Sequence, residues 1–364
     1  MRMTRRELLS SAVAGLASVA GTVAVDRQLL ADPQAPRFDR PHRVLQAPSR
    51  TSRDRPPVIT TVAFHPQEPK LAAAGDDHHI YLWNIAGDGP ATMLRGHADW
   101  ILSVAYHPAG RVLATAGADH RVVFWDTTSG EPVHVFSDAR HVVTQLAWNR
   151  AGDRIAGVGF ENRVRVYDTA QRSLIMELPS PGADMRVIAY SPDDRWLAAA
   201  GRDGATRIWR ATTGEHLFDY RAHRQRVRGL AFSPDGQYVV TAGEDRVVHI
   251  HGVEADDEGF DLPVGKGKIL CIAFIGPTQL ATGGADNRLR LWDLKQRVEI
   301  GELTGPLGSV ASLAYSPRYR LLAAGCFDTT ARVWAMADEV SVEKLEVAGP
   351  PEPVSVRAQS EEKR

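Results

Sequence analysis

The residues best suited to metal chemistry lie in one short run, Asp76-Asp77-His78-His79. Carboxylates and imidazoles are common ligands of transition metals. Adjacent residues of a strand point to opposite faces, however, so His78 and His79 would not easily share one ion. Asp77 also belongs to a periodic series of acidic residues, for which a turn role is sufficient. We therefore predict no metal site here.

Other runs that suggest phosphate or acyl chemistry are incomplete. The segment Gly265-Lys266-Gly267-Lys268 is followed by Ile269 and lacks the spacing of a nucleoside triphosphate-binding loop. The pair of glycines at 157 and 159 lacks the third glycine of a dinucleotide site, and no G-x-S-x-G run is present. We predict no catalytic residues, no cofactor and no enzymatic activity.

The elements that would carry these residues are short strands. Residues 96–126 read GHADWILSVAYHPAGRVLATAGADHRVVFWD. Apolar and polar residues alternate over Ile101–Tyr106, Val112–Ala116 and Arg121–Trp125, and a further strand-like segment follows at Pro132–Phe136. Alternation with period two, bounded by Gly, Pro and Asp, predicts antiparallel strands. One unit is thus a four-stranded sheet of about 40 residues, which needs neighbouring sheets to bury its faces.

The same unit recurs seven times. Its triplet Val104-Ala105-Tyr106 has six counterparts, which begin at Val62, Leu146, Ile188, Leu230, Ile272 and Leu313. The spacings between successive triplets are 42 five times and then 41. A second marker follows the same period: Trp83, Trp125, Tyr167, Trp209, His251, Trp292 and Trp334. An acidic residue precedes each of those by six positions, in a series that we call the turn acids: Asp77, Asp119, Glu161, Asp203, Asp245, Asp286 and Asp328.

Each marker has a structural explanation. The middle residue of every triplet is Ala, which fits where the innermost strands of wedge-shaped sheets converge. The third residue is always aromatic and would fill the space between adjacent sheets. A turn acid can accept backbone N–H bonds and stabilise its turn. We therefore predict a structural role for all three markers.

The repeat resembles the WD40 repeat. The resemblance is carried by Gly96-His97, by Asp119 in the turn and by Trp125-Asp126 at the end of the third strand. The final pair recurs as Trp292-Asp293, Trp83-Asn84 and Tyr167-Asp168. This resemblance implies an all-β fold, a seven-bladed β-propeller of four antiparallel strands per blade over residues 43–348.

The resemblance also implies a hydrogen-bonded tetrad of His, Ser or Thr, Asp and Trp in each blade. The His is found only as His97 and His223. The position two residues before the turn acid, taken as that of the Ser or Thr, is Gly in six copies and Cys326 in the seventh. On this assignment we expect no blade to hold a complete tetrad.

The two ends of the chain lie outside the repeats. Residues 1–25 combine a basic start with an uncharged Ala, Gly and Val run, which is a signal layout. Thr4-Arg5-Arg6-Glu7-Leu8-Leu9 resembles the twin-arginine motif of bacteria. This implies export to the periplasm or cell envelope, with a membrane tether if the segment stays uncleaved. A disordered terminus is the alternative.

The remaining boundaries follow from composition. Residues 26–42 are interpreted as a linker, and 349–364 as a disordered tail. Arg43–Ala47 is expected to complete blade seven and to close the ring, although Val340–Val347 is a competing strand. The two cysteines, Cys271 and Cys326, are predicted to be buried free thiols rather than a disulfide.

The surface is the remaining place for function. Lys and Arg number 43 against 44 Asp and Glu, which argues against bulk nucleic-acid binding. Five basic residues are predicted to form an arc on the rim of blades four to six: Arg202, Arg224, Arg226, Lys266 and Lys268. Three aromatic residues are predicted to be partly exposed on the same rim: Trp100, Phe160 and Phe327. Arg and aromatic residues are enriched in interface hot spots.

We therefore expect an exported, monomeric, non-catalytic scaffold that binds a protein partner through this rim. One alternative is a propeller that binds a small ligand, glycan or ion in its central channel, with or without enzymatic activity. The axial positions that can be read are mostly aliphatic or small, which argues against an enzyme. Another alternative is an intracellular signalling scaffold.

Overall fold

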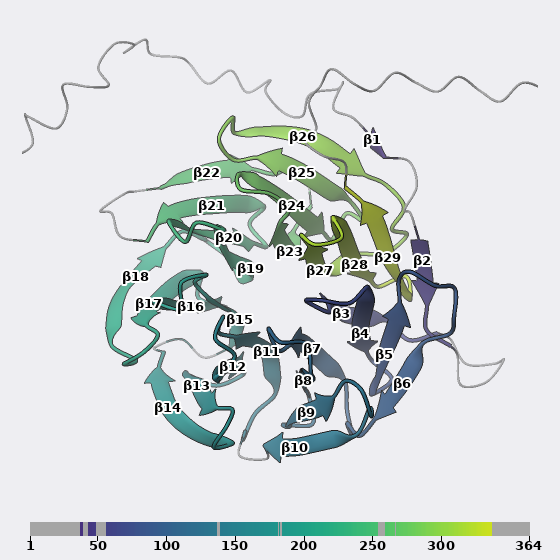
Figure 1. Cartoon of the computed structure of the whole chain (residues 1–364). Helices are drawn as coiled ribbons and strands as arrows, with labels where there is room; N and C mark the ends of the chain where they lie inside the picture. Colours follow the sequence, from purple (N-terminus) through teal and green to yellow (C-terminus); the bar gives the residue numbers. More distant parts are fainter. Residues whose placement is uncertain are drawn as a thin grey trace, which may run out of the picture.

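Seven sheets surround a central axis in the computed structural model, as Figure 1 shows. The structure describes residues 37–38, 43–48, 56–136, 139–180, 182, 184–253, 259–265 and 267–336. This described part of the chain contains strands and turns and no helix. It therefore offers no helix with the length and hydropathy of a membrane span.

Each of the first six blades is a meander of four consecutive strands, with the first strand nearest the axis. Blade one has β3 (Ile59–Phe64), β4 (Lys70–Gly75), β5 (His79–Asn84) and β6 (Thr92–Arg95). Blade two has β7 (Ile101–Tyr106), β8 (Val112–Gly117), β9 (Val122–Asp126) and β10 (Pro132–Phe136). Blade three has β11 (Val143–Trp148), β12 (Arg154–Gly159), β13 (Arg163–Asp168) and β14 (Ser173–Pro179).

Blade four has β15 (Met185–Tyr190), β16 (Trp196–Gly201), β17 (Ala205–Arg210) and β18 (His216–Arg221). Blade five has β19 (Val227–Phe232), β20 (Tyr238–Gly243), β21 (Val247–Gly252) and β22 (Phe260–Pro263). Blade six has β23 (Ile269–Phe274), β24 (Gln279–Gly284), β25 (Leu289–Asp293) and β26 (Val298–Leu303). Blade seven has β27 (Val310–Ser316), β28 (Leu321–Cys326), β29 (Thr330–Ala335) and β2 (Arg43–Gln46). The predicted seven-bladed, all-β fold is confirmed.

The ring is closed by the N-terminal strand. β2 pairs antiparallel with β29, so that it supplies the fourth strand of blade seven as the sequence predicts. Leu45 is only 5% exposed and packs in one cluster with Val333 and Ile59, which joins blade seven to blade one. The competing segment 340–347 lies outside the described residues. β2 therefore covers the edge of β29, which would otherwise be open to pairing with another chain.

Part of the predicted linker also pairs with the propeller. β1 (Arg37–Phe38) lies parallel to the outer strand β26 and makes blade six five-stranded. This strand has no periodic signal in the sequence, because two residues cannot show alternation. The predicted signal segment and tail lie outside the described residues.

Hydrophobic clusters fill the spaces between neighbouring blades. One cluster combines Val158 and Val166 of blade three with Leu197 and Trp209 of blade four. Trp209 is completely buried, as expected for the marker at the end of the third strand. Aromatic bodies between sheets supply large apolar contact areas. The blades are therefore held together mainly by side chains from two sheets at a time.

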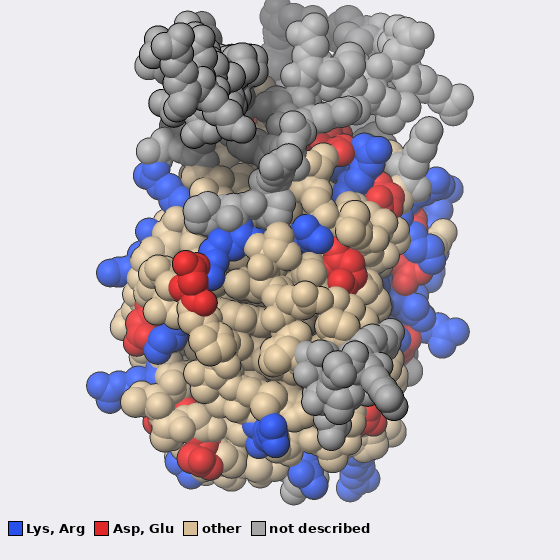
Figure 2. Space-filling model, turned by 90° about the vertical axis from the view of Figure 1, so that its right-hand side faces the viewer, with Lys and Arg blue, Asp and Glu red and all other residues tan. Residues whose placement is uncertain are grey.

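The outer wall is different in character. Figure 2 shows it from the side of β2, β5 and β6, where acidic and basic side chains are interspersed over a largely uncharged surface. A nucleic-acid-binding surface requires a broad patch of positive charge. This side of the propeller has no such patch.

A β-bulge interrupts the innermost hairpin of all seven blades. In each case the second residue of the first strand has no partner on the second strand: Thr60, Leu102, Thr144, Arg186, Arg228, Leu270 and Ala311. A bulge bends its strand and changes the direction of a side chain. All seven of these bulge residues line the central cavity.

Candidate functional site at the mouth of the channel

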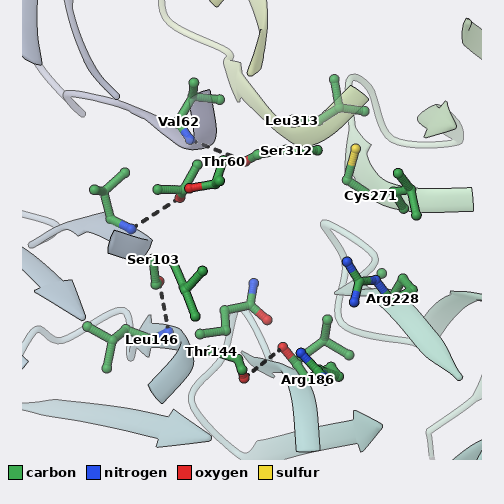
Figure 3. A pocket seen from close by; sticks show the side chains of 18 of the residues that line it. Thr60, Val62, Ser103, Thr144, Leu146, Arg186, Arg228, Cys271, Ser312 and Leu313 are labelled. Atoms are coloured by element: carbon green, nitrogen blue, oxygen red, sulfur yellow. Dashed lines mark hydrogen bonds between the residues drawn. The ribbon is translucent and has the colours of Figure 1, made fainter. Parts of the chain in front are cut away.

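The central channel contains a cavity of about 490 Å³, and Figure 3 shows the side chains that line it. Its walls come from the innermost strands of the blades. At the end where the turn acids lie, the lining continues with Val58, Asp76, Trp100 and Phe327. This volume lies within the range of small-molecule sites. The cavity and its rim therefore form one continuous candidate site.

Two bulge residues place positive charge inside the channel. Arg186 on β15 and Arg228 on β19 come from adjacent blades and extend toward the same cavity (Figure 3). The expectation that axial positions are mostly aliphatic or small is wrong for these two. Alternation along a strand does not predict a bulge, and the bulge is what turns these two side chains toward the channel. The sequence signal for this placement is that each arginine lies two residues before the triplet of its own blade.

The two arginines differ in their surroundings. Arg186 places its Nε 2.5 Å from Asp184 Oδ1, and its guanidinium carbon lies 4.3 Å from the centre of the Phe160 ring. Among the described residues, none makes a hydrogen bond or ion pair with Arg228. Burial, together with the nearby charge of Arg186, lowers the pKa of Arg228 below its ordinary value. An arginine remains charged near neutral pH even so.

The predicted basic arc is partly neutralised. Arg226 lies between Asp184 and Glu244, at 3.4 Å from each carboxylate. Lys268 Nζ lies 2.7 Å from Glu244 Oε2. Burial alone would raise the pKa of Glu244, but Lys268 and Arg226 outweigh this effect, and the pKa falls below its usual value. These two basic residues are thus committed to ion pairs within the protein.

The other members of the arc are freer. Arg202 and Arg224 are exposed, and neither side chain forms an ion pair with a described residue. Lys266 lies outside the described residues. Positive charge available to a partner at the described rim is therefore concentrated at Arg202 and Arg224, while Arg228 offers positive charge inside the channel.

The aromatic residues separate into two environments. Trp100 is 50% exposed and Phe327 is 51% exposed, and both line the cavity at its mouth. They come from blades two and seven, which flank blade one. Leu307, which the sequence did not single out, is 82% exposed and binds Asp328 Oδ2 through its backbone nitrogen at 2.8 Å. Phe160 instead stacks on Arg186. We call Trp100, Leu307 and Phe327 the apolar sector.

Blade two holds a complete tetrad, which corrects the expectation that no blade does. His97 Nδ1 lies 2.8 Å from Asp119 Oδ2, and His97 Nε2 lies 2.7 Å from Thr115 Oγ1. Trp125 Nε1 donates to Thr115 Oγ1 at 2.8 Å. The threonine is four residues before the turn acid rather than two.

The glycine two residues before the turn acid is explained by close backbone packing, not by the tetrad. A Cβ on Gly117 would lie 2.0 Å from the carbonyl oxygen of Trp100, because the chain approaches the start of the inner strand closely there. Ala118 N then donates to this same oxygen at 2.8 Å. Glycine is needed where two backbones come this near.

The other turn acids have their own partners. Blade five repeats the His arrangement, with His223 between Asp245 and Thr241. In the remaining blades the residue four positions after the acid binds it, in the pairs Asp77 with Tyr81, Glu161 with Arg165, Asp203 with Arg207, Asp286 with Arg290 and Asp328 with Arg332. These contacts direct the turn acids into the blades rather than toward a ligand.

The two cysteines are free and buried. Cys271 lies in blade six and lines the cavity, and Cys326 ends β28 in blade seven. Burial raises the pKa of the Cys326 thiol to about 12. The prediction of two buried thiols is confirmed.

Comparison with known proteins identifies the repeat. The family model described as WD domain, G-beta repeat matches residues 48–84, 89–126, 173–210, 214–251, 262–293 and 297–335, which together make up more than half of the chain. A stretch of 62 residues is 40% identical to a protein of Eremothecium gossypii described as probable cytosolic iron-sulfur protein assembly protein 1. That match covers 16% of this chain and 19% of the relative, so the chain spans about a fifth of the length of this curated protein.

Proposed function

The chain belongs to the WD40-repeat family, and from this premise we propose that it is a non-catalytic scaffold that binds a protein partner at the mouth of its channel. Propellers of this family commonly bind other proteins. Site chemistry, rather than the fold, has to identify the binding face.

One observation carries the choice of face. The apolar sector places two half-exposed aromatic side chains, Trp100 and Phe327, at a single cavity mouth, and the 82% exposed Leu307 is held to Asp328, the residue after Phe327. Large apolar residues are costly to leave in water, and aromatic residues are frequent among interface hot spots. Arg202 and Arg224 lie on the same rim in blades four and five. The partner should therefore present apolar side chains to the apolar sector and acidic residues to these arginines.

Partner capture from the native host's cell-envelope fraction tests this proposal. We expect the double variant Trp100→Ala with Phe327→Ala to lose a partner that the wild type captures. The matched control is Val133→Ala with Val135→Ala, which removes two apolar side chains of 40% and 43% exposure from the outer strand β10. Retained capture by the aromatic variant, or equal loss in the control, would contradict the proposed face.

The contribution of the basic residues is tested separately. Arg202→Glu with Arg224→Glu should weaken partner binding at least about tenfold, because two favourable charge contacts become unfavourable. The melting temperature should stay within about 2 °C of the wild type, because exposed substitutions usually have small effects on stability. Unchanged binding would remove the basic residues from the interface.

We also propose that the protein is exported through the twin-arginine route, on the support of Arg5-Arg6 and the uncharged run that follows. Fractionation of cells that express residues 1–42 fused to a reporter tests this. We expect the reporter in the periplasm or envelope, and in the cytoplasm after Arg5→Lys with Arg6→Lys. A wild-type fusion that stays in the cytoplasm would favour the intracellular scaffold instead.

A further inference from the structure

We propose that Arg186 and Arg228 form a binding site for an oxyanion, the phosphate or carboxylate group of a small molecule that enters the central channel. This inference is independent of the proposed protein partner, since it concerns the interior of the channel rather than its rim.

The first argument is geometric. Both arginines occupy the bulge position of an innermost strand, and the two strands belong to adjacent blades. Figure 3 shows their guanidinium groups extending toward the same cavity. A guanidinium presents its N–H donors as a planar fork that matches the oxygens of phosphate and carboxylate groups. Two such groups that converge from neighbouring strands can bind one oxyanion together.

The second argument is the local balance of charge. Among the described residues, the ion pairs around the channel arginines involve three cations, Arg186, Arg226 and Lys268, and two carboxylates, Asp184 and Glu244, and Arg228 adds a fourth cation. Both carboxylates are already shared by ion pairs with three of the cations. Two positive charges are therefore in excess, and Arg228 is the cation without a described partner.

Desolvation makes this excess costly. Arg186 and Arg228 are only half-buried in the channel wall, so each guanidinium loses part of its hydration, and an anion bound beside them would offset that loss. Asp76 also lines the cavity, but it comes from blade one, and one of its oxygens accepts a hydrogen bond from Val58 N at 2.8 Å. The charge of Glu244 acts on Arg228, but no described carboxylate forms an ion pair or hydrogen bond with it, so an external oxyanion can take this position.

A neutral donor lines the same cavity as the arginines. Gln145 on β11 lines the same cavity, and its Oε1 accepts a hydrogen bond from Ile188 N at 2.8 Å. With the oxygen engaged, the side-chain NH₂ group remains as a donor. Blades three, four and five thus supply one amide and two guanidinium groups.

Isothermal titration calorimetry of the full chain tests the site, with inorganic phosphate and citrate as separate probes at ionic strength matched with sodium chloride. We expect binding of at least one probe. Arg228→Gln and Arg186→Gln should each weaken that binding about tenfold or more, because a charge-assisted hydrogen bond is lost. The matched control, Arg111→Gln, removes the same charge from an exposed position just before β8, outside both proposed sites, and should bind as the wild type does.

The possible outcomes separate clearly. Loss of binding in the two channel variants, with binding retained in the control, supports the site, and the probe that binds identifies phosphate or carboxylate chemistry. No binding of either probe to the wild type at about 10 mM overturns the proposal. Equal weakening in all three variants also overturns it, because it indicates general charge attraction. Should Arg228→Gln fail to fold, Arg228→Lys keeps the charge without the planar fork and should still weaken binding.

Discussion

The tetrad of blade two should respond strongly to the substitution Thr115→Val. Asp119 can only accept, so His97 donates from Nδ1 and presents Nε2 as an acceptor to the Thr115 hydroxyl. The same hydroxyl oxygen accepts from Trp125 Nε1. Valine keeps the shape of threonine and removes both interactions at once.

The expected cost follows from burial. Thr115 is 0% exposed and Trp125 is 1% exposed, so water cannot replace the lost partner. A buried donor left unsatisfied costs about 1–3 kcal/mol, and the bond lost at His97 adds about 1 kcal/mol. Thr115→Val should therefore lower the free energy of unfolding by about 2–4 kcal/mol.

Urea unfolding followed by tryptophan fluorescence measures this change, and blade six provides the matched control. Thr282 is also buried, and within the described part of the chain its hydroxyl accepts from Trp292 Nε1 alone, at 3.0 Å. Thr282→Val should cost about 1–3 kcal/mol, less than Thr115→Val. The reasoning is refuted if Thr115→Val costs less than about 1 kcal/mol, or no more than Thr282→Val.

Further predictions concern acid, the ring-closing strand β2 and the thiols. Burial alone would raise the pKa values of Asp203 and Asp328, but hydrogen bonds from their own blades outweigh it and lower both. The stability that these two carboxylates contribute is fully present above their unfolded pKa of about 3.9 and is lost as the pH falls through the lower folded pKa values. The urea concentration at the unfolding midpoint should therefore decrease when the pH is lowered below about 4. A midpoint that stays constant in this pH range contradicts the prediction. Leu45→Ala should lower the free energy of unfolding by about 2–4 kcal/mol, because it leaves a cavity between blades seven and one; thermal unfolding measures this change. A loss below about 1 kcal/mol would show that strand β2 adds little to stability. A thiol reagent should label Cys271 and Cys326 only after unfolding, because burial raises the pKa of both and blocks access, and rapid labelling of the native protein would count against this.

Much of the architecture was predictable because it depends on local patterns. Alternation with period two selects strands, and the regular spacing of the triplets sets the number of blades. Blade two illustrates the accuracy: Ile101–Tyr106 and Pro132–Phe136 were predicted with the observed ends. Arg43–Ala47 could be assigned to blade seven because its place in the repeat is that of a fourth strand.

The candidate site was harder to predict because it depends on where side chains point and on which blades meet. Gly117 was assigned the place of Thr115 in the tetrad, since no sequence pattern shows which residue reaches His97 across 18 positions. Arg186 and Arg228 lie 42 residues apart, and the bulges that turn both into one cavity are formed by pairing between strands. Ion pairs such as that of Lys268 with Glu244, 24 residues apart, likewise form only when the ring is assembled. Repeat spacing therefore specifies the propeller, whereas the charge at its channel follows from contacts between residues that are distant along the chain.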